Sequence, residues 1–488
     1  MNIKDVRSAF DTGKGGFYAF MFITAVVTGI IISFGIFTAL QTVSLAAITF
    51  ALFFSYRKPH LVFYCALPLL FIPLSLGTLF HLRITWAAEP LILILFLIIV
   101  VRNMQKSERS FVLSHENPFL LLIFLYMIVL LANYLRNPLP ASSALGMAEE
   151  MGGIRFYYEK VLIFSLSLSV GYLAETQTAF RQKFINIVLI MASVVTIIGL
   201  LIFVWEALYR FIENLIMTDV FNNASLLTGL WTKAVDPFTG ALRNSVLWVT
   251  PFGILLLLAD VTLMNKPAKV VLLVLFVSGL VLSATRNFFF GILCGLLVWA
   301  FLTHNKKMII VLVMVGIVGL LLPGIGLLAR QFRRILYFPA DIERLTSFRY
   351  ELFKIYWESF VRHPLFGVGV GMTEIGYVPA ASPEYFLQQN LRFGGHGFFL
   401  GTLYTQGIVG LLPFVLLYLL TARIGFILFR KGKDHSTKAL GLLAIMFVAY
   451  SVIPFLVGGR ETYNQFFVIV GLVGGTYGYY KKQSRKDI

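Results

Sequence analysis

The sequence is poor in charged residues and in cysteine, and the scarcity of charge argues against an ordinary globular protein. Only 13% of its 488 residues are charged, whereas 58% are hydrophobic. The two cysteines, Cys65 and Cys294, fall inside apolar segments, so a disulfide framework is not expected. The seven histidines include no i, i+4 pair and no cysteine partner, and no Asp-x-Asp occurs in a predicted outer segment. We therefore expect neither a metal site nor a cofactor.

Apolar runs of 17–24 residues recur along the chain. A helix needs about 20 residues to cross the hydrocarbon core of a bilayer, and a chain in lipid must pair its backbone groups internally. The sequence therefore predicts an all-α polytopic membrane protein with about 12–14 transmembrane helices. We expect spans near residues 17–39, 41–56, 61–80, 84–101, 117–134, 161–176, 184–206, 244–264, 270–285, 287–303, 308–328, 398–421, 439–458 and 463–480.

These spans divide the chain into three parts. Residues 1–328 hold eleven predicted spans with short loops, residues 329–397 form one large loop, and residues 398–488 hold the last spans and a basic tail. No soluble second domain and no nucleic-acid partner is expected. Fourteen crossings place both termini on one side of the membrane.

The distribution of basic residues indicates which side that is. With the termini inside, the inside segments hold 23 Lys and Arg residues and the outside segments hold 17, as the positive-inside rule requires. Inside there are 15 Lys and 8 Arg, whereas outside there are 3 Lys and 14 Arg. Because arginine binds phosphate and carboxylate bidentately, this excess favours an outward-facing site for an anionic ligand. The alternative is that these arginines anchor the spans at lipid headgroups.

Arginine or histidine marks four points at which the chain re-enters the membrane from outside, namely Arg243, Arg286, His396 and Arg460. A charge near the bilayer usually marks a partner or a pathway, and an imidazole accepts a proton from a hydroxyl near neutral pH. If the helices bundle, these groups converge on one site. The alternatives are a simple loop residue for Arg286 and a structural histidine for His396. The outer segment 135–160 adds Arg155 as a candidate.

The large loop contains two local patterns. Residues 344–362, which include Arg349, place Leu345, Phe348, Leu352, Ile355, Trp357 and Phe360 in a partly helical pattern among charges. This pattern predicts an amphipathic helix lying on the membrane or on the bundle. The glycines at 367, 369 and 371 follow His363-Pro364 and lack the strand-then-helix context of a nucleotide loop, so they predict a tight turn.

Three motifs resemble the O-antigen ligase and O-antigen polymerase superfamily of bacterial inner membranes. His396 is followed, after the family's spacing, by Gly407 and Gly410, although Gly397 stands where the ligase pattern has Asn, Ser or Gln. Ser283-Ala-Thr-Arg286 opens a span and is similar to the family's Ser-x-Ser-Arg. Arg349, followed by His363-Pro-Leu-Phe-Gly-Val-Gly369, resembles the family's Arg…His-Pro-Leu-x-Gly-x-Gly. A weaker likeness lies in Gly240-Ala-Leu-Arg243-Asn244.

The resemblance implies a metal-independent membrane glycosyltransferase of the C-type architecture, which uses a glycan carried on undecaprenyl diphosphate. The acceptor would be lipid A–core for a ligase, a second lipid-linked glycan for a polymerase, or a protein for related transferases. It implies that Arg286 and Arg243 bind the diphosphate, that His396 activates or orients the acceptor hydroxyl, and that Arg349 belongs to a loop closing over both substrates. Arg460 and Arg155 are further expected substrate contacts. The site would face the periplasm, and membrane lipids would surround the protein.

A lipid-linked oligosaccharide flippase is the rival from another class, since it also has about fourteen helices and basic residues along its path. A flippase would carry its charge in a cavity reached from both faces and would not need a loop of this length ending in histidine. The large loop and the arrangement of Arg286 and His396 at outer re-entry points therefore favour the enzyme.

Overall fold

A computed structural model describes residues 92–93, 95–101, 103, 110–114, 117–136, 154–204, 234–235, 242–243, 249–261, 264–283, 285–304, 350–370, 397–457 and 460–486. The chain divides into two compact units, Met1–Glu108 and Arg109–Ile488. The described residues of the first unit are helical, and Ile92, Leu95 and Ile99 are buried.

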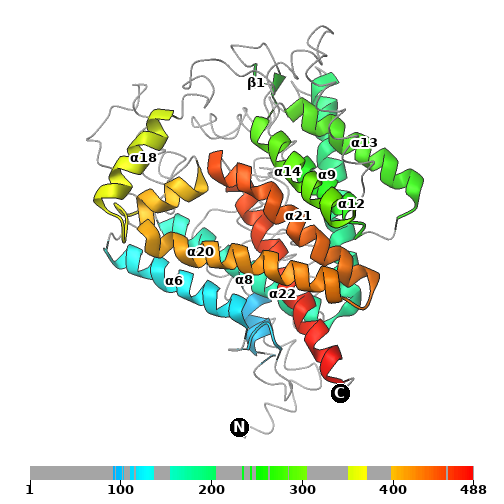
Figure 1. Cartoon of the computed structure of the whole chain (residues 1–488), viewed down its shortest axis with the longest axis horizontal. Helices are drawn as coiled ribbons and strands as arrows, with labels where there is room; N and C mark the ends of the chain where they lie inside the picture. The colour runs from blue at the N-terminus through cyan, green and yellow to red at the C-terminus, as the bar shows by residue number, and fades with distance from the viewer. Residues whose placement is uncertain are drawn as a thin grey trace, which may run out of the picture. The chain divides into compact units, whose positions relative to one another are not determined.

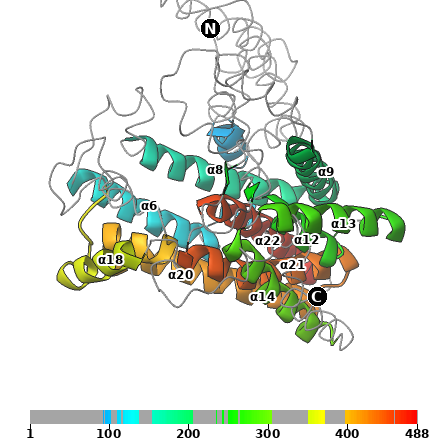
Figure 2. The ribbon, with the colours of Figure 1, turned by 90° about the horizontal axis from the view of Figure 1, so that it is seen from above.

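The second unit is a helical bundle (Figure 1). Its described helices are α6 (Pro118–Arg136), α8 (Ile154–Thr176), α9 (Thr178–Val204), α12 (Thr250–Leu258), α13 (Lys266–Ser283), α14 (Arg286–Leu302), α18 (Tyr350–Arg362), α20 (Phe398–Lys431), α21 (His435–Val457) and α22 (Arg460–Lys486). Two short strands, β1 (Ala234–Val235) and β2 (Leu242–Arg243), form an antiparallel two-residue ladder. Figures 1 and 2 both show α6 beside α20 and α18 beside the start of α20, and these pairs are in contact.

Local sequence explains where several helices begin. Asn117 precedes α6, and its Oδ1 accepts a hydrogen bond from the Phe119 amide (3.0 Å). Asp434 precedes α21, and its carboxylate accepts bonds from the amide and the hydroxyl of Thr437 (2.7 and 2.8 Å). Such side chains occupy N–H groups that have no partner inside the first turn of a helix.

Within the described residues, five helices are long and apolar enough to cross a membrane: α6, α9 as far as Leu201, α13, α20 and α21. This result confirms the predicted class, an all-α polytopic membrane protein. From residue 117 onward, each predicted span that falls on described residues coincides with a helix. The predicted count of 12–14 also concerns residues outside the described ranges, and it stays a prediction.

The helices α8 and α22 are the most closely packed pair and form the interior of the bundle. A Cβ on Gly475 would lie 2.1 Å from the carbonyl oxygen of Gly171, and one on Gly471 would lie 2.3 Å from that of Ser167. The two backbones therefore touch along a stripe of small residues, as in membrane helix pairs that lack a hydrophobic driving force. Ser165, Ser167 and Ser169 of α8 are also buried in this interior.

We expect Gly475→Ala to destabilise the bundle by about 1–3 kcal/mol, because the added methyl group meets backbone rather than a movable side chain. In thermal unfolding in detergent, the Gly475→Ala variant should have a lower melting temperature than the native chain has. Gly474→Ala is the matched control, since its Cβ would lie 3.3 Å from the ring of Phe119, which can shift. Equal melting temperatures for the two variants would contradict this account of the helix pair.

The segments predicted to be cytoplasmic meet at one end of the bundle, which we call the lysine end. The side chain of Glu175, at the end of α8, is fully buried and forms an ion pair with Lys482 of α22 (2.9 Å). Asp260, which follows α12, pairs with Lys269 of α13 and lies 3.3 Å from His435 at the start of α21. These contacts bring segments that were predicted to be cytoplasmic together at one end of the bundle, and the side of the membrane that this end faces stays a prediction.

Candidate functional site

The opposite end of the bundle collects the helix ends that carry the predicted site arginines, and we call it the arginine end. The first of these is the start of α14. The helix α14 runs antiparallel to α21, because a Cβ on Gly291 would lie 2.6 Å from the Tyr450 carbonyl and one on Gly295 would lie 3.1 Å from the Met446 carbonyl. The start of α14 at Arg286 therefore lies near the C-terminal end of α21.

The starts of three more helices reach the same end. Gly397, immediately before α20, lies so close to α21 that its Cβ would be 2.8 Å from the Leu456 carbonyl. The helix α22 begins at Arg460, three residues after α21 ends. The helix α8 runs parallel to α22, with the Lys160 ammonium 3.7 Å from the centre of the Tyr463 ring. Four helix N-termini thus lie at one end, where unpaired N–H groups and the helix dipoles favour an anion.

The predicted site residues are located as follows. Arg286 and Arg460 are the first residues of α14 and α22, and Arg155 is the second residue of α8. Arg243 lies in β2, which contacts α13. The side chains of these four arginines lie outside the described part of the chain, as do His396 and Arg349 entirely. Four helix starts therefore share one end of the bundle: those that carry Arg155, Arg286 and Arg460, and the start of α20, which follows His396. The roles of these four side chains stay predictions.

A backbone clamp joins the large loop to α20. The helix is interrupted at Gly407, whose φ and ψ are 65° and −164°. At this break the amides of Val368 and Gly369 donate to the carbonyls of Tyr404 and Thr405 (2.8 and 3.0 Å). In return, the amides of Ile408 and Val409 donate to the carbonyls of Pro364 and Leu365 (2.9 and 3.1 Å). The turn at 363–370 therefore supplies partners for backbone groups that the interrupted helix leaves open.

Only glycine fits at the two crossing points of the clamp. A Cβ on Gly407 would lie 2.3 Å from the Leu365 carbonyl oxygen, and one on Gly367 would lie 2.5 Å from the Tyr404 carbonyl oxygen. Gly367 also has a positive φ of 64°, which side chains disfavour. The predicted tight turn is therefore present at residues 367 and 369, and it has a structural partner in α20 that the sequence did not indicate.

The predicted amphipathic helix is α18, and it packs on the bundle against α20. Leu352 and Tyr356 are buried and form a cluster with Tyr404 of α20, with the Tyr356 and Tyr404 ring centres 5.0 Å apart. Trp357, which belongs to the predicted apolar pattern, is 55% exposed and does not face α20 as the buried residues do. The buried position is the neighbouring Tyr356, which the apolar pattern omitted. The helix therefore supports the clamp from the side of the loop.

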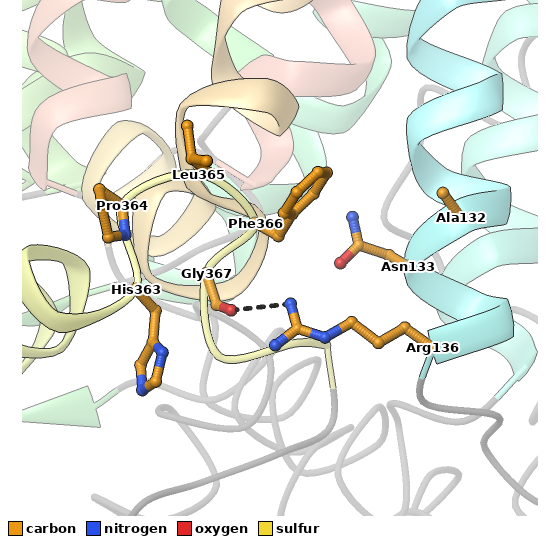
Figure 3. A pocket seen from close by; sticks show the side chains of 8 residues that line it. All are labelled: Ala132, Asn133, Arg136, His363, Pro364, Leu365, Phe366 and Gly367. Carbon is orange, nitrogen blue, oxygen red and sulfur yellow. Dashed lines mark hydrogen bonds between the residues drawn. The ribbon is translucent and has the colours of Figure 1, made fainter.

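A pocket of about 380 Å³ lies between the end of α6 and the clamp turn (Figure 3). Its lining residues are Ala132, Asn133, Arg136, His363, Pro364, Leu365, Phe366 and Gly367. The guanidinium of Arg136 spans the gap and donates from Nη1 to the Gly367 carbonyl (3.2 Å). Sequence reasoning did not select Asn133, although a lone amide in the apolar run of α6 is the kind of residue that marks a functional position.

The part of the chain that the structure describes contains no group of three or more His, Cys, Asp or Glu side chains able to hold a metal ion. The predicted independence of metal is a property of the reaction, and it stays a prediction.

The fold and the site together define a multi-pass α-helical membrane protein that gathers helix N-termini and arginine positions at one end. Residues 271–415 match the family model of the O-antigen ligase. The match covers α14, α18, the clamp and the first half of α20, and it confirms the resemblance to the O-antigen ligase superfamily that the motifs indicate. None of the curated proteins compared with the chain matches it.

Proposed function

We propose that the protein is a bacterial inner-membrane glycosyltransferase that moves a glycan from undecaprenyl diphosphate to an acceptor hydroxyl on the periplasmic face. The O-antigen ligase match at residues 271–415 is the observation that carries this proposal. Within the family the reaction is of the ligase type or of the related polymerase type. We take the ligase reaction, with lipid A–core as acceptor, as the leading form, and the joining of two lipid-linked repeats as the second.

The chemistry of the arginine end fits this reaction. Breaking the bond between the glycan and the diphosphate leaves growing negative charge on the leaving group, and fixed positive groups stabilise that charge. In our proposal Arg286 and Arg243 bind the diphosphate, with the N-terminus of α14 contributing its N–H groups. His396 accepts the proton of the acceptor hydroxyl as this oxygen attacks the anomeric carbon.

The remaining predicted residues hold the substrates. Arg460 and Arg155 stand at the starts of α22 and α8 and would contact the donor there. Arg349 immediately precedes α18, so the packing of α18 against α20 would fix its position over the site. Both termini would lie in the cytoplasm, with the lysine end facing inward.

A reconstituted transfer reaction tests the proposal. Purified protein in lipid, given a synthetic undecaprenyl-diphosphate oligosaccharide with EDTA present, should transfer the glycan without added metal. Transfer to lipid A–core would identify a ligase, and a ladder that grows from the donor alone would identify a polymerase. Arg286→Ala should lower the rate constant by about 10²–10³-fold, as for the loss of one transition-state donor.

Two outcomes of this experiment would contradict parts of the proposal. Folded protein that forms no product with any acceptor, but moves the lipid-linked donor between leaflets of a vesicle, would favour a flippase. Transfer that stops in EDTA and returns with a divalent cation would show that metal independence is wrong, while leaving the transferase intact.

A further inference from the structure

We propose that the pocket between α6 and the clamp turn binds a sugar unit of the glycan through its hydroxyl groups. This inference rests on the proposed function, and it assigns a glycan-binding role to Asn133, Arg136 and Phe366. The pocket is separate from the predicted catalytic positions in sequence, because its residues come from α6 and from the turn at 363–367. Its volume of about 380 Å³ lies within the usual range of small-ligand pockets.

The amide of Asn133 decides the chemical class of the ligand. Its side chain is 3% exposed, and its Nδ2 donates to the Val129 carbonyl (3.1 Å). Its Oδ1 is buried, and no donor among the described residues reaches it. A buried acceptor without a donor is costly, so the position fits a ligand that carries its own hydrogen-bond donor. A sugar hydroxyl supplies one, whereas an ionised phosphate or a hydrocarbon chain does not.

Arg136 provides the complementary donors. A guanidinium has five N–H groups and no acceptor, and the bond to the Gly367 carbonyl holds it across the pocket. Figure 3 shows the guanidinium and the Asn133 amide on the same side of the pocket, each directed from α6 toward the clamp turn. A donor group next to an acceptor group matches the hydroxyls of a sugar ring, which both donate and accept.

Leu365 and Phe366 of the clamp turn form the apolar wall of the pocket. Phe366 and Leu365 are 51% and 59% exposed, and Figure 3 shows the Phe366 ring on the side of the pocket that faces Asn133. The backbone at Leu365 is fixed by the bond from the Val409 amide (3.1 Å). An exposed phenyl ring suits the apolar C–H face of a sugar, and the fixed backbone that carries it loses little conformational freedom on binding.

The test measures sugar binding apart from glycan transfer. The full chain in lipid nanodiscs would be probed by saturation-transfer NMR with methyl glycosides of glucose, galactose, N-acetylglucosamine and rhamnose. At least one glycoside should bind the native chain, and Asn133→Leu and Phe366→Ala should each weaken its binding about tenfold. Thr196→Val is the matched control, because Thr196 is also buried and also bonds a carbonyl of its own helix (2.7 Å). Its binding should equal that of the native chain.

Two accompanying measurements separate a binding role from a structural one. Asn133→Leu should melt at the native temperature or above, because it removes a buried acceptor that lacks a protein donor, whereas loss of a structural amide would lower the melting temperature. Sugar binding should not change with salt concentration, since the ligand is neutral. Displacement of the glycoside by inorganic diphosphate would overturn the proposal in favour of an anion site.

The remaining outcomes keep this proposal distinct from the proposed function. Binding that is equal in native and variant chains, or absent for every glycoside, overturns the sugar site. An unchanged KM for the lipid-linked donor in an Asn133→Leu protein that still transfers glycan also overturns it, while the transferase stands. The native chain could also bind a sugar in a manner that depends on Asn133 and yet transfer no glycan. That result would support the sugar site and reject the transferase.

Discussion

His396→Ala should lower the rate constant for glycan transfer by about 10²–10⁴-fold, the usual contribution of a general base. The lipid-linked donor should still reach the outer leaflet in cells that carry the variant. The reason lies in the position of Gly397, which packs against the Leu456 carbonyl at the end of α21. His396 immediately precedes Gly397 in the sequence, and in our proposal its imidazole accepts the proton of the acceptor hydroxyl. Transfer would be followed on purified protein, and donor orientation by labelling of intact cells.

His304→Asn is the control for this experiment. His304 follows α14 at the end remote from Arg286 and has a positive φ of 54°, which asparagine tolerates better than most residues. Its transfer rate should equal that of the native chain. Donor trapped on the cytoplasmic face of the His396→Ala cells would contradict the enzyme and favour the flippase.

Gly407→Ala should destabilise the bundle by about 2–5 kcal/mol and abolish transfer. The φ and ψ at this residue, 65° and −164°, are essentially restricted to glycine. The added methyl group would also lie 2.3 Å from the Leu365 carbonyl oxygen and must displace the turn. Displacement of the turn breaks the hydrogen bonds that the amides of Ile408 and Val409 donate to it. The turn and α18 then lose their attachment to α20. Thermal unfolding and the transfer assay would be measured on the same preparation.

Ile408→Ala isolates the backbone effect. Ile408 is the next residue along the same break and is 45% exposed, and truncation leaves its amide free to donate to Pro364. Its stability should stay within about 1 kcal/mol of the native chain. Similar losses of stability in Gly407→Ala and Ile408→Ala would contradict this account. They would mean that side chains, and not the close contact of two backbones, hold the turn to α20.

The helices of the second unit were largely predictable because most of them contain a long apolar run, and α18 shows an amphipathic pattern instead. The boundaries of α6 and α14 differ from the prediction by only one or two residues. The prediction for α8 was less complete, because its first turns, from Ile154 to Lys160, contain charged residues and lie outside the apolar run. The ammonium of Lys160 lies over the ring of Tyr463. This contact joins segments that are distant in the sequence, and hydropathy does not predict it.

The site was predictable only in part. Charge and motifs selected Arg286 and Arg460, and the antiparallel packing of α14 on α21 gives a physical reason for their helix starts to share one end. The clamp was not predictable, because nothing in the spacing of Gly367 and Gly407 says that these glycines meet. Asn133 was missed because its importance depends on an unpaired oxygen, and only three-dimensional packing reveals which polar atoms lack a partner.

The order of synthesis gives the clamp a further consequence. The ribosome makes residues 363–370 before it makes α20, so the backbone partners of the turn are missing until residues 404–409 have been synthesised. Until then the turn's amides and carbonyls are without the bonds that α20 supplies. The turn therefore cannot acquire these four bonds until residues 404–409 have been made, and a chain that stops after residue 397 lacks the groups that supply them.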